Sequence, residues 1–243
     1  MIPVADDNWR GRGRGHAYIT WAIILINIFV FVFIQEFGLN DSVTLALSVV
    51  PEEIAAGQRL WTLITCQFAH ASLSHIAGNM LYLGIFGDNV ECRIGKRRYI
   101  FLYLLSGTFG VLVHVLASIL AGGAAAQVPL LGASAAVSGI LASYLVLFPG
   151  NRVVVLLFNF IPTTFSAWIV IASWFVLQVF SELAEGLSSG TAYTAHIAGF
   201  IVSWLWSRHY KRAETERIQA ARRDRYIRHD TDDGFRWWIV DDQ

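Results

Sequence analysis

The chain has 243 residues, of which 55% are hydrophobic and only 15% are charged, and its formal net charge is zero. This balance, together with several apolar runs of about 20 residues, excludes an ordinary soluble domain and indicates a helical protein that crosses a membrane several times. The two cysteines, Cys66 and Cys92, are too few for a disulfide framework.

Six apolar runs follow one another along the chain and predict six membrane-spanning helices. The second and sixth runs are short, because a helix needs about 20 residues to cross the hydrocarbon, so polar residues beside them should enter the interface. We expect a six-helix domain of residues 19–208 between two polar tails, residues 1–18 and 209–243. The predicted spans are residues 19–37, 76–90, 99–120, 131–148, 165–183 and 193–206.

The basic residues predict the direction of the spans. All 18 except Arg59 lie before the first run, after the sixth run, or in the connections after the second and fourth runs. By the positive-inside rule both tails are therefore cytoplasmic, and six spans satisfy the alternation. Cys66 and Cys92 lie on opposite sides of the bilayer in this topology and are not expected to pair. The Gly-Arg repeat of residues 11–15 is interpreted as flexible basic chain that follows no strand, and not as a nucleotide-binding loop.

The connection of residues 38–74 should lie on the outer side of the membrane. It is too apolar for an ordinary soluble loop, so we expect it to be partly embedded at the interface, with Trp61 as an aromatic anchor.

Small residues recur every fourth position in two of the runs, which predicts that these two helices approach each other closely. Close packing of the fourth and sixth spans would bring Ser134 next to His196. The two stripes are Ala135, Gly139 and Ser143 in the fourth span and Ala195, Gly199 and Ser203 in the sixth.

Polar groups suited to hydrolysis gather at the outer ends of three spans that run in the same direction. A serine needs a base to become a nucleophile, and histidine is the commonest one, so Ser134 is the candidate nucleophile and His196 the candidate base. His75 and Asn79 lie one turn apart on one helix face and can donate to an oxyanion, together with the Ser134 backbone N–H at a helix start. A third member of the site would be a carboxylate, but the nearest acidic residues lie at other helix ends or in connections. We therefore expect a Ser134–His196 dyad and not a triad. Ser138 is the rival nucleophile by geometry.

These residues stand in recognisable stretches. One is His70-Ala-Ser-Leu-Ser-His75-Ile-Ala-Gly-Asn79-Met80, and others cover residues 87–95, 132–134 and 195–199. From about residue 61 to residue 206 the chain resembles the rhomboid family of intramembrane serine proteases. The resemblance implies an all-α, six-transmembrane-helix bundle with both termini cytoplasmic.

The resemblance also implies roles. Ser134 would be the nucleophile and His196 the base, His75 and Asn79 would serve the oxyanion, and the family's structural turn would hold Glu91, Arg93 and Gly95. The activity would be cleavage of transmembrane protein substrates near the outer membrane face, with small residues at the scissile position. The expected partners are such substrates and the lipid bilayer, without nucleic acid, cofactor or metal. The expected location is a bacterial or archaeal plasma membrane, and the sequence indicates no particular oligomeric state.

Two departures keep an alternative open. The family usually has glycine after the serine and an aromatic residue four positions after it, whereas this chain has Ala135 and Ser138. A catalytically impaired rhomboid-like protein that binds membrane clients is therefore the second hypothesis. A small transporter or channel is the third, and the lack of an inverted repeat of broken helices disfavours it. His114 in the third span is interpreted as a packing residue.

The fifth span is the candidate movable wall through which a substrate enters. It carries bulky aromatic residues in place of the small-residue stripe, so its contacts should be looser. An ordinary peripheral helix with aromatic residues facing lipid is the alternative. The aromatic residues are Trp168, Trp174, Phe175 and Phe180.

Overall fold

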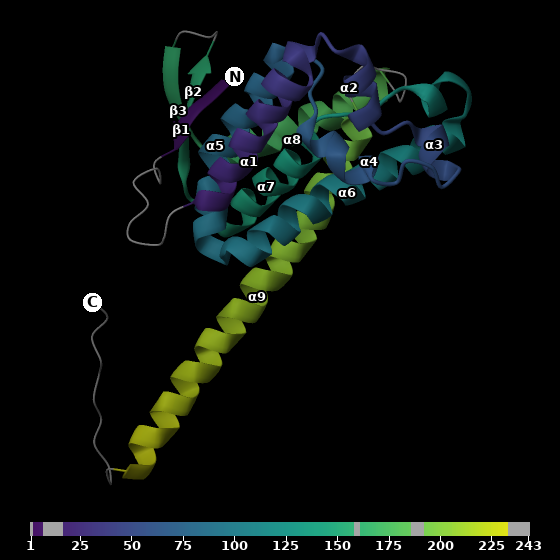
Figure 1. Ribbon diagram of the computed structural model, residues 1–243. Helices are drawn as coiled ribbons and strands as arrows, with labels where there is room; N and C mark the ends of the chain where they lie inside the picture. Colours follow the sequence, from purple (N-terminus) through teal and green to yellow (C-terminus); the bar gives the residue numbers. More distant parts are fainter. Residues whose placement is uncertain (1, 7–16, 158–160, 186–191, 233–243) are drawn as a thin grey trace. The chain divides into compact units, whose positions relative to one another are not determined.

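The computed structural model describes residues 2–6, 17–157, 161–185 and 192–232 (Figure 1). Most of these residues are helical. The chain divides into two compact units, Met1–Ser207 and Arg208–Gln243. The second unit contains the charged end of helix α9 (Tyr193–Asp232), and everything described below belongs to the first.

A helix lies at each of the six predicted spans. Helices α6 and α8 are each long and apolar enough to cross a membrane, and Tyr18–Ile34 and α7 are shorter apolar helices. Helix α5 is long but carries several polar residues, which lowers its hydropathy. The bounds are α1 (Tyr18–Phe29) with its π-helical extension η1 (Val30–Ile34), α5 (Leu73–Ile94), α6 (Lys96–Ala121), α7 (Ser134–Leu147), α8 (Ala167–Glu185) and α9.

The all-α expectation is wrong in one respect, because the chain also contains a small antiparallel sheet (Figure 1). Strands β1 (Ile2–Asp6), β2 (Arg152–Leu157) and β3 (Ile161–Ser166) lie in that order, with Ile2 opposite Leu156. Three consecutive valines favour a strand at β2. A strand therefore precedes the Gly-Arg repeat, which itself lies outside the described residues.

The connection of residues 38–74 folds into short helices, and Arg59 joins two of them. The Arg59 guanidinium donates to Glu53 Oε2 at 2.6 Å and to the backbone oxygens of Leu45 and Ala46 at 2.6 and 2.8 Å. The apolar residues of this segment partly form their own core, since Val49 and Cys66 pack with side chains of α6. Trp61 remains 62% exposed, and its role as an interfacial anchor stays a prediction. The short helices are η2 (Glu36–Gly38), α2 (Asp41–Leu47), α3 (Pro51–Ala55), α4 (Thr62–Thr65) and η3 (Cys66–Phe68).

The predicted close packing of α7 and α9 is confirmed, and α6 joins it. A Cβ atom added at Gly139 would lie 2.5 Å from Ser203 Oγ, and one added at Gly110 of α6 would lie 2.5 Å from the Ala195 carbonyl oxygen. A Cβ atom at Gly199 would collide with the Ala135 carbonyl oxygen. These contacts leave no room for larger side chains, so they set the distance between the three helices.

Glu91, near the end of α5, caps the N-terminus of α1. Its carboxylate accepts from the backbone N–H groups of Ile19 and Thr20 at 3.0 and 2.7 Å and from Thr20 Oγ1 at 2.8 Å. Helix α1 has no side-chain cap within its own sequence, so this buried acid supplies one. Gly95, at φ +85°, then allows α5 to turn directly into α6.

Candidate active site

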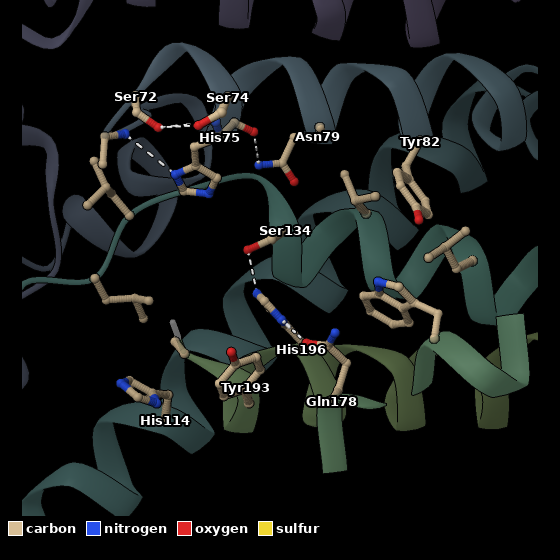
Figure 2. Close-up of a pocket in the computed structure, with 18 of the residues that line it drawn as sticks. Ser72, Ser74, His75, Asn79, Tyr82, His114, Ser134, Gln178, Tyr193 and His196 are labelled. Atoms are coloured by element: carbon tan, nitrogen blue, oxygen red, sulfur yellow. Dashed lines mark hydrogen bonds between the residues drawn. The ribbon is translucent and has the colours of Figure 1, made fainter. Parts of the chain in front are cut away.

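Ser134 and His196 lie in direct contact, as the small-residue spacing predicts. Ser134 is the first residue of α7, and His196 lies in the first turn of α9. The Ser134 Oγ and His196 Nε2 atoms are 2.6 Å apart (Figure 2). His196 is only 8% exposed, so this hydrogen bond is largely shielded from solvent.

A third side chain, Gln178 of α8, holds the other nitrogen of the imidazole. Gln178 Oε1 lies 2.7 Å from His196 Nδ1 (Figure 2). An amide oxygen only accepts, so Nδ1 carries the proton, and Nε2 is then the acceptor for the Ser134 hydroxyl. The sequence analysis missed Gln178. The available signal was an amide within an apolar span, where polar groups are costly unless they are paired.

Trp174, one turn before Gln178, stacks on the imidazole, with ring centroids 6.3 Å apart and planes inclined at 28°. An aromatic residue therefore supports His196 from α8, although α7 has Ser138 where the family commonly has an aromatic residue. Ser138 is buried, and its hydroxyl lies 2.8 Å from the His196 carbonyl oxygen and 2.7 Å from that of Ala135. These bonds leave Ser138 unsuited to be the nucleophile.

His75 and Asn79 lie beside the pair on α5 (Figure 2). His75 Nδ1 accepts from the Ala71 N–H at 3.5 Å, which leaves Nε2 as the protonated nitrogen. One N–H of the Asn79 amide donates to the His75 carbonyl oxygen at 3.1 Å, and the amide has a second N–H to offer. The structure thus brings together all four residues that the sequence singles out.

These groups line a cavity of about 570 Å³. His114 of α6 also lines it, and the Nδ1 atom of this buried histidine has no hydrogen-bond partner among the described residues. His114 therefore lies in the wall of the cavity, and its interpretation as a packing residue stays a prediction. The other lining side chains include Ser72, Ser74, Tyr82, Val137, Trp174, Gln178 and Tyr193.

His70, from the first recognisable stretch, stays behind the cavity. It is fully buried, and its ring meets that of His75 edge-on with centroids 5.0 Å apart. Burial, reinforced by the nearby His75, lowers the pKa of His70 to about 3. His70 is therefore neutral and supports the position of His75.

The substitution at Ala135 leaves the cavity open. Ala135 is 3% exposed, and its methyl group lies against Gly110 of α6. The extra methyl therefore fills a helix interface and does not narrow the site.

The His75 ring lies so close to the backbone at residue 132 that only glycine fits there. Its φ is +125°, and an added Cβ would lie 2.7 Å from His75 Nε2. We expect Gly132→Ala to reduce the free energy of unfolding by about 1–3 kcal/mol through backbone strain. We also expect it to slow serine labelling by about 10²-fold, because His75 must move. Thermal unfolding in detergent and the rate of labelling by a fluorophosphonate measure the two effects.

Gly78→Ala is the matched control, since Gly78 lines the same cavity but has no atom within 4 Å of an added Cβ. Equal labelling rates for the two alanine variants would contradict the proposed constraint at Gly132.

The apolar helices and the shielded serine–histidine pair define a helical membrane protein with a polar site inside its bundle. The Rhomboid domain family matches residues 57–212, which is more than half of the chain. The chain therefore belongs to the rhomboid family.

Curated relatives agree with this assignment. The mitochondrial Rhomboid protein 1 of Saccharomyces cerevisiae is 28% identical over 167 residues, which cover 67% of this chain and 46% of the yeast protein. RHOMBOID-like protein 4 of Arabidopsis thaliana is 30% identical over 63% of this chain and 35% of its own length. The mitochondrial RHOMBOID-like protein 12 of the same plant is 32% identical over 62% and 46%. The chain thus spans less than half the length of each of these relatives.

Proposed function

We propose that this protein is an intramembrane serine endopeptidase that cleaves transmembrane protein substrates near the outer membrane face. The observation that carries the proposal is the 2.6 Å contact between Ser134 Oγ and His196 Nε2, with the His196 tautomer set by Gln178. Only in this tautomer is Nε2 free to take the serine proton.

The reaction begins when Ser134 Oγ attacks the scissile carbonyl carbon and transfers its proton to His196 Nε2. The oxyanion that forms accepts from His75 Nε2–H, from the free N–H of Asn79 and from the Ser134 backbone N–H at the helix start. His196 then protonates the leaving amine, and the C–N bond breaks to leave an acyl-enzyme. Water, deprotonated by His196, hydrolyses the ester and restores the Ser134 hydroxyl.

The proposed topology has six spans, in the domain of residues 19–208, and both tails in the cytoplasm. The site supports it, because α5, α7 and α9 all begin at the cavity while α5 ends at the start of α1. Cysteine-accessibility labelling from each side of sealed vesicles tests this arrangement. We keep a bacterial or archaeal plasma membrane as the proposed location, although two of the relatives are mitochondrial by name.

The alternative is a client-binding protein without protease activity, which Ala135 and Ser138 had kept open. The Ala135 methyl faces another helix, and Trp174 supplies aromatic support for His196. Both observations support the protease.

The deciding experiment uses the purified full-length chain in lipid vesicles. A fluorophosphonate probe should modify Ser134, as mapped by mass spectrometry, and a model transmembrane substrate should be cut near its outer end. A folded protein that neither reacts with the probe nor cuts the substrate would favour the client-binding function.

We further expect α8 to move when a substrate enters from the lipid. In an apolar stretch of 18 residues, only 17% of α8 is buried, whereas 44% of α6 is buried. Displacement of α8 therefore breaks fewer contacts. In a Cys92→Ser background, paired cysteines on facing sides of the outer halves of α5 and α8 can be cross-linked. Cleavage of a membrane substrate should then fall at least tenfold while the small probe still labels Ser134. Full cleavage after complete cross-linking would rule out entry between these two helices.

A further inference from the structure

We infer that Gln178 is a positioning residue for the base His196. Because Gln178 belongs to α8, the orientation of the His196 ring depends on whether α8 is packed against α9. The inference rests on the proposed function and deepens it, because it adds a third side chain to the Ser134–His196 dyad and locates it on the helix proposed to move.

The hydrogen-bond chain runs from α8 through α9 to α7. Gln178 Oε1 accepts from His196 Nδ1 at 2.7 Å, and His196 Nε2 accepts from Ser134 Oγ at 2.6 Å. A group that accepts from one ring nitrogen of a histidine fixes both the tautomer and the ring orientation. Gln178 therefore occupies the place that a carboxylate takes in a serine–histidine–aspartate triad.

A neutral amide suits this position better than an acid. Gln178 lies within an apolar helix, where an ionised carboxylate would be strongly penalised. The amide oxygen still offers a dipole to the imidazolium that forms during the reaction. The result is a triad-like arrangement that needs no buried charge in its resting state.

Aromatic residues of α8 near Gln178 also contact α9, at His196 and one turn further along. Trp174 stacks on His196, and the Phe175 and Phe200 rings lie with centroids 4.4 Å apart. On the other face, Val176, Leu177 and Phe180 are 49%, 61% and 64% exposed. Displacement of α8 from α9 would therefore withdraw the hydrogen-bond acceptor and the stacked ring from His196 together.

This arrangement has a consequence for the catalytic cycle. When a substrate enters by displacing α8, His196 loses its contacts with Gln178 and Trp174. The reaction can then proceed only after α8 has returned to its place against α9. The helix then both admits the substrate and restores the base, so chemistry is confined to the closed state.

The test compares two replacements of Gln178 in the full chain. Gln178→Met keeps the unbranched length but removes the amide oxygen, whereas Gln178→Glu keeps an acceptor oxygen. We expect Gln178→Met to lower kcat for a transmembrane substrate and the probe-labelling rate by about 10- to 10²-fold, with KM changed by no more than about twofold. Gln178→Glu keeps an acceptor oxygen but places an acid within an apolar helix, so its kcat should lie between the values of Gln178→Met and wild type. Leu177→Ala, on the exposed face of the same helix, should behave as wild type.

A second readout does not depend on activity. In protein carrying ¹⁵N-labelled histidine, the ring shifts of His196 should report a proton on Nδ1 in the wild type and a mixture of tautomers in Gln178→Met. The His196 signals are identified by their loss in His196→Ala.

The outcomes separate the two proposals. A defect confined to KM, or a kcat of Gln178→Met within twofold of wild type, would overturn the role of Gln178. An unchanged tautomer in Gln178→Met would overturn it as well. If the shifts change as expected while wild-type Ser134 reacts with no probe, the positioning role stands and the protease proposal fails.

Discussion

Ser134→Ala and His196→Ala should each abolish cleavage of a model transmembrane substrate, with a loss of at least about 10⁴-fold in kcat. Without Ser134 Oγ no acyl-enzyme forms, and without His196 no group accepts the serine proton at 2.6 Å. Cleavage in lipid vesicles, followed by gel analysis, measures the loss. Both variants should elute as folded monodisperse protein in detergent, which separates lost chemistry from lost structure.

Two serine variants serve as controls for this result. Ser74→Ala changes another serine that lines the cavity, and probe labelling should persist. Ser138→Ala removes bonds to two carbonyl oxygens, so thermal stability should fall but Ser134 should still be labelled. Labelling that survives in Ser134→Ala and disappears in Ser138→Ala would reverse the assignment of the nucleophile.

Asn79→Ala should lower kcat by about 10²–10³-fold and leave KM nearly unchanged, because a donor to the oxyanion acts mainly in the transition state. The amide lies in the cavity wall one turn below His75, and one of its N–H groups is not used by the bond to the His75 carbonyl. Steady-state cleavage at several mole fractions of substrate in the bilayer separates the two constants.

Asn79→Asp is the matched variant, since it keeps the shape of the side chain but has no N–H to donate. We expect a loss of kcat at least as large as in Asn79→Ala. If both variants raise KM and leave kcat intact, Asn79 is a binding or packing residue.

Local patterns in the sequence were sufficient to predict where the helices lie and to name four residues of the polar site, Ser134, His196, His75 and Asn79. Apolar runs and small-residue stripes are local patterns, and each predicted run contains a helix. Because His75 and Asn79 are four residues apart, they share a helix face whatever surrounds them. The stripe in α7 and α9 was enough to predict that Ser134 meets His196.

Features that depend on residues far apart in the chain could not be predicted from local patterns and are known only from the three-dimensional structure. Strand β1 pairs with β2 across about 150 residues, and no local pattern marks that partner. Glu91 caps α1 by accepting from the N–H of Ile19, which lies 72 residues earlier in the chain. Gln178 reads in sequence as one amide in an apolar span, and it becomes part of the site only because packing of α8 on α9 brings its oxygen to His196. The helical periodicity of the sequence predicts which face of a helix a side chain occupies. Which residue it contacts there depends on how whole helices pack against one another.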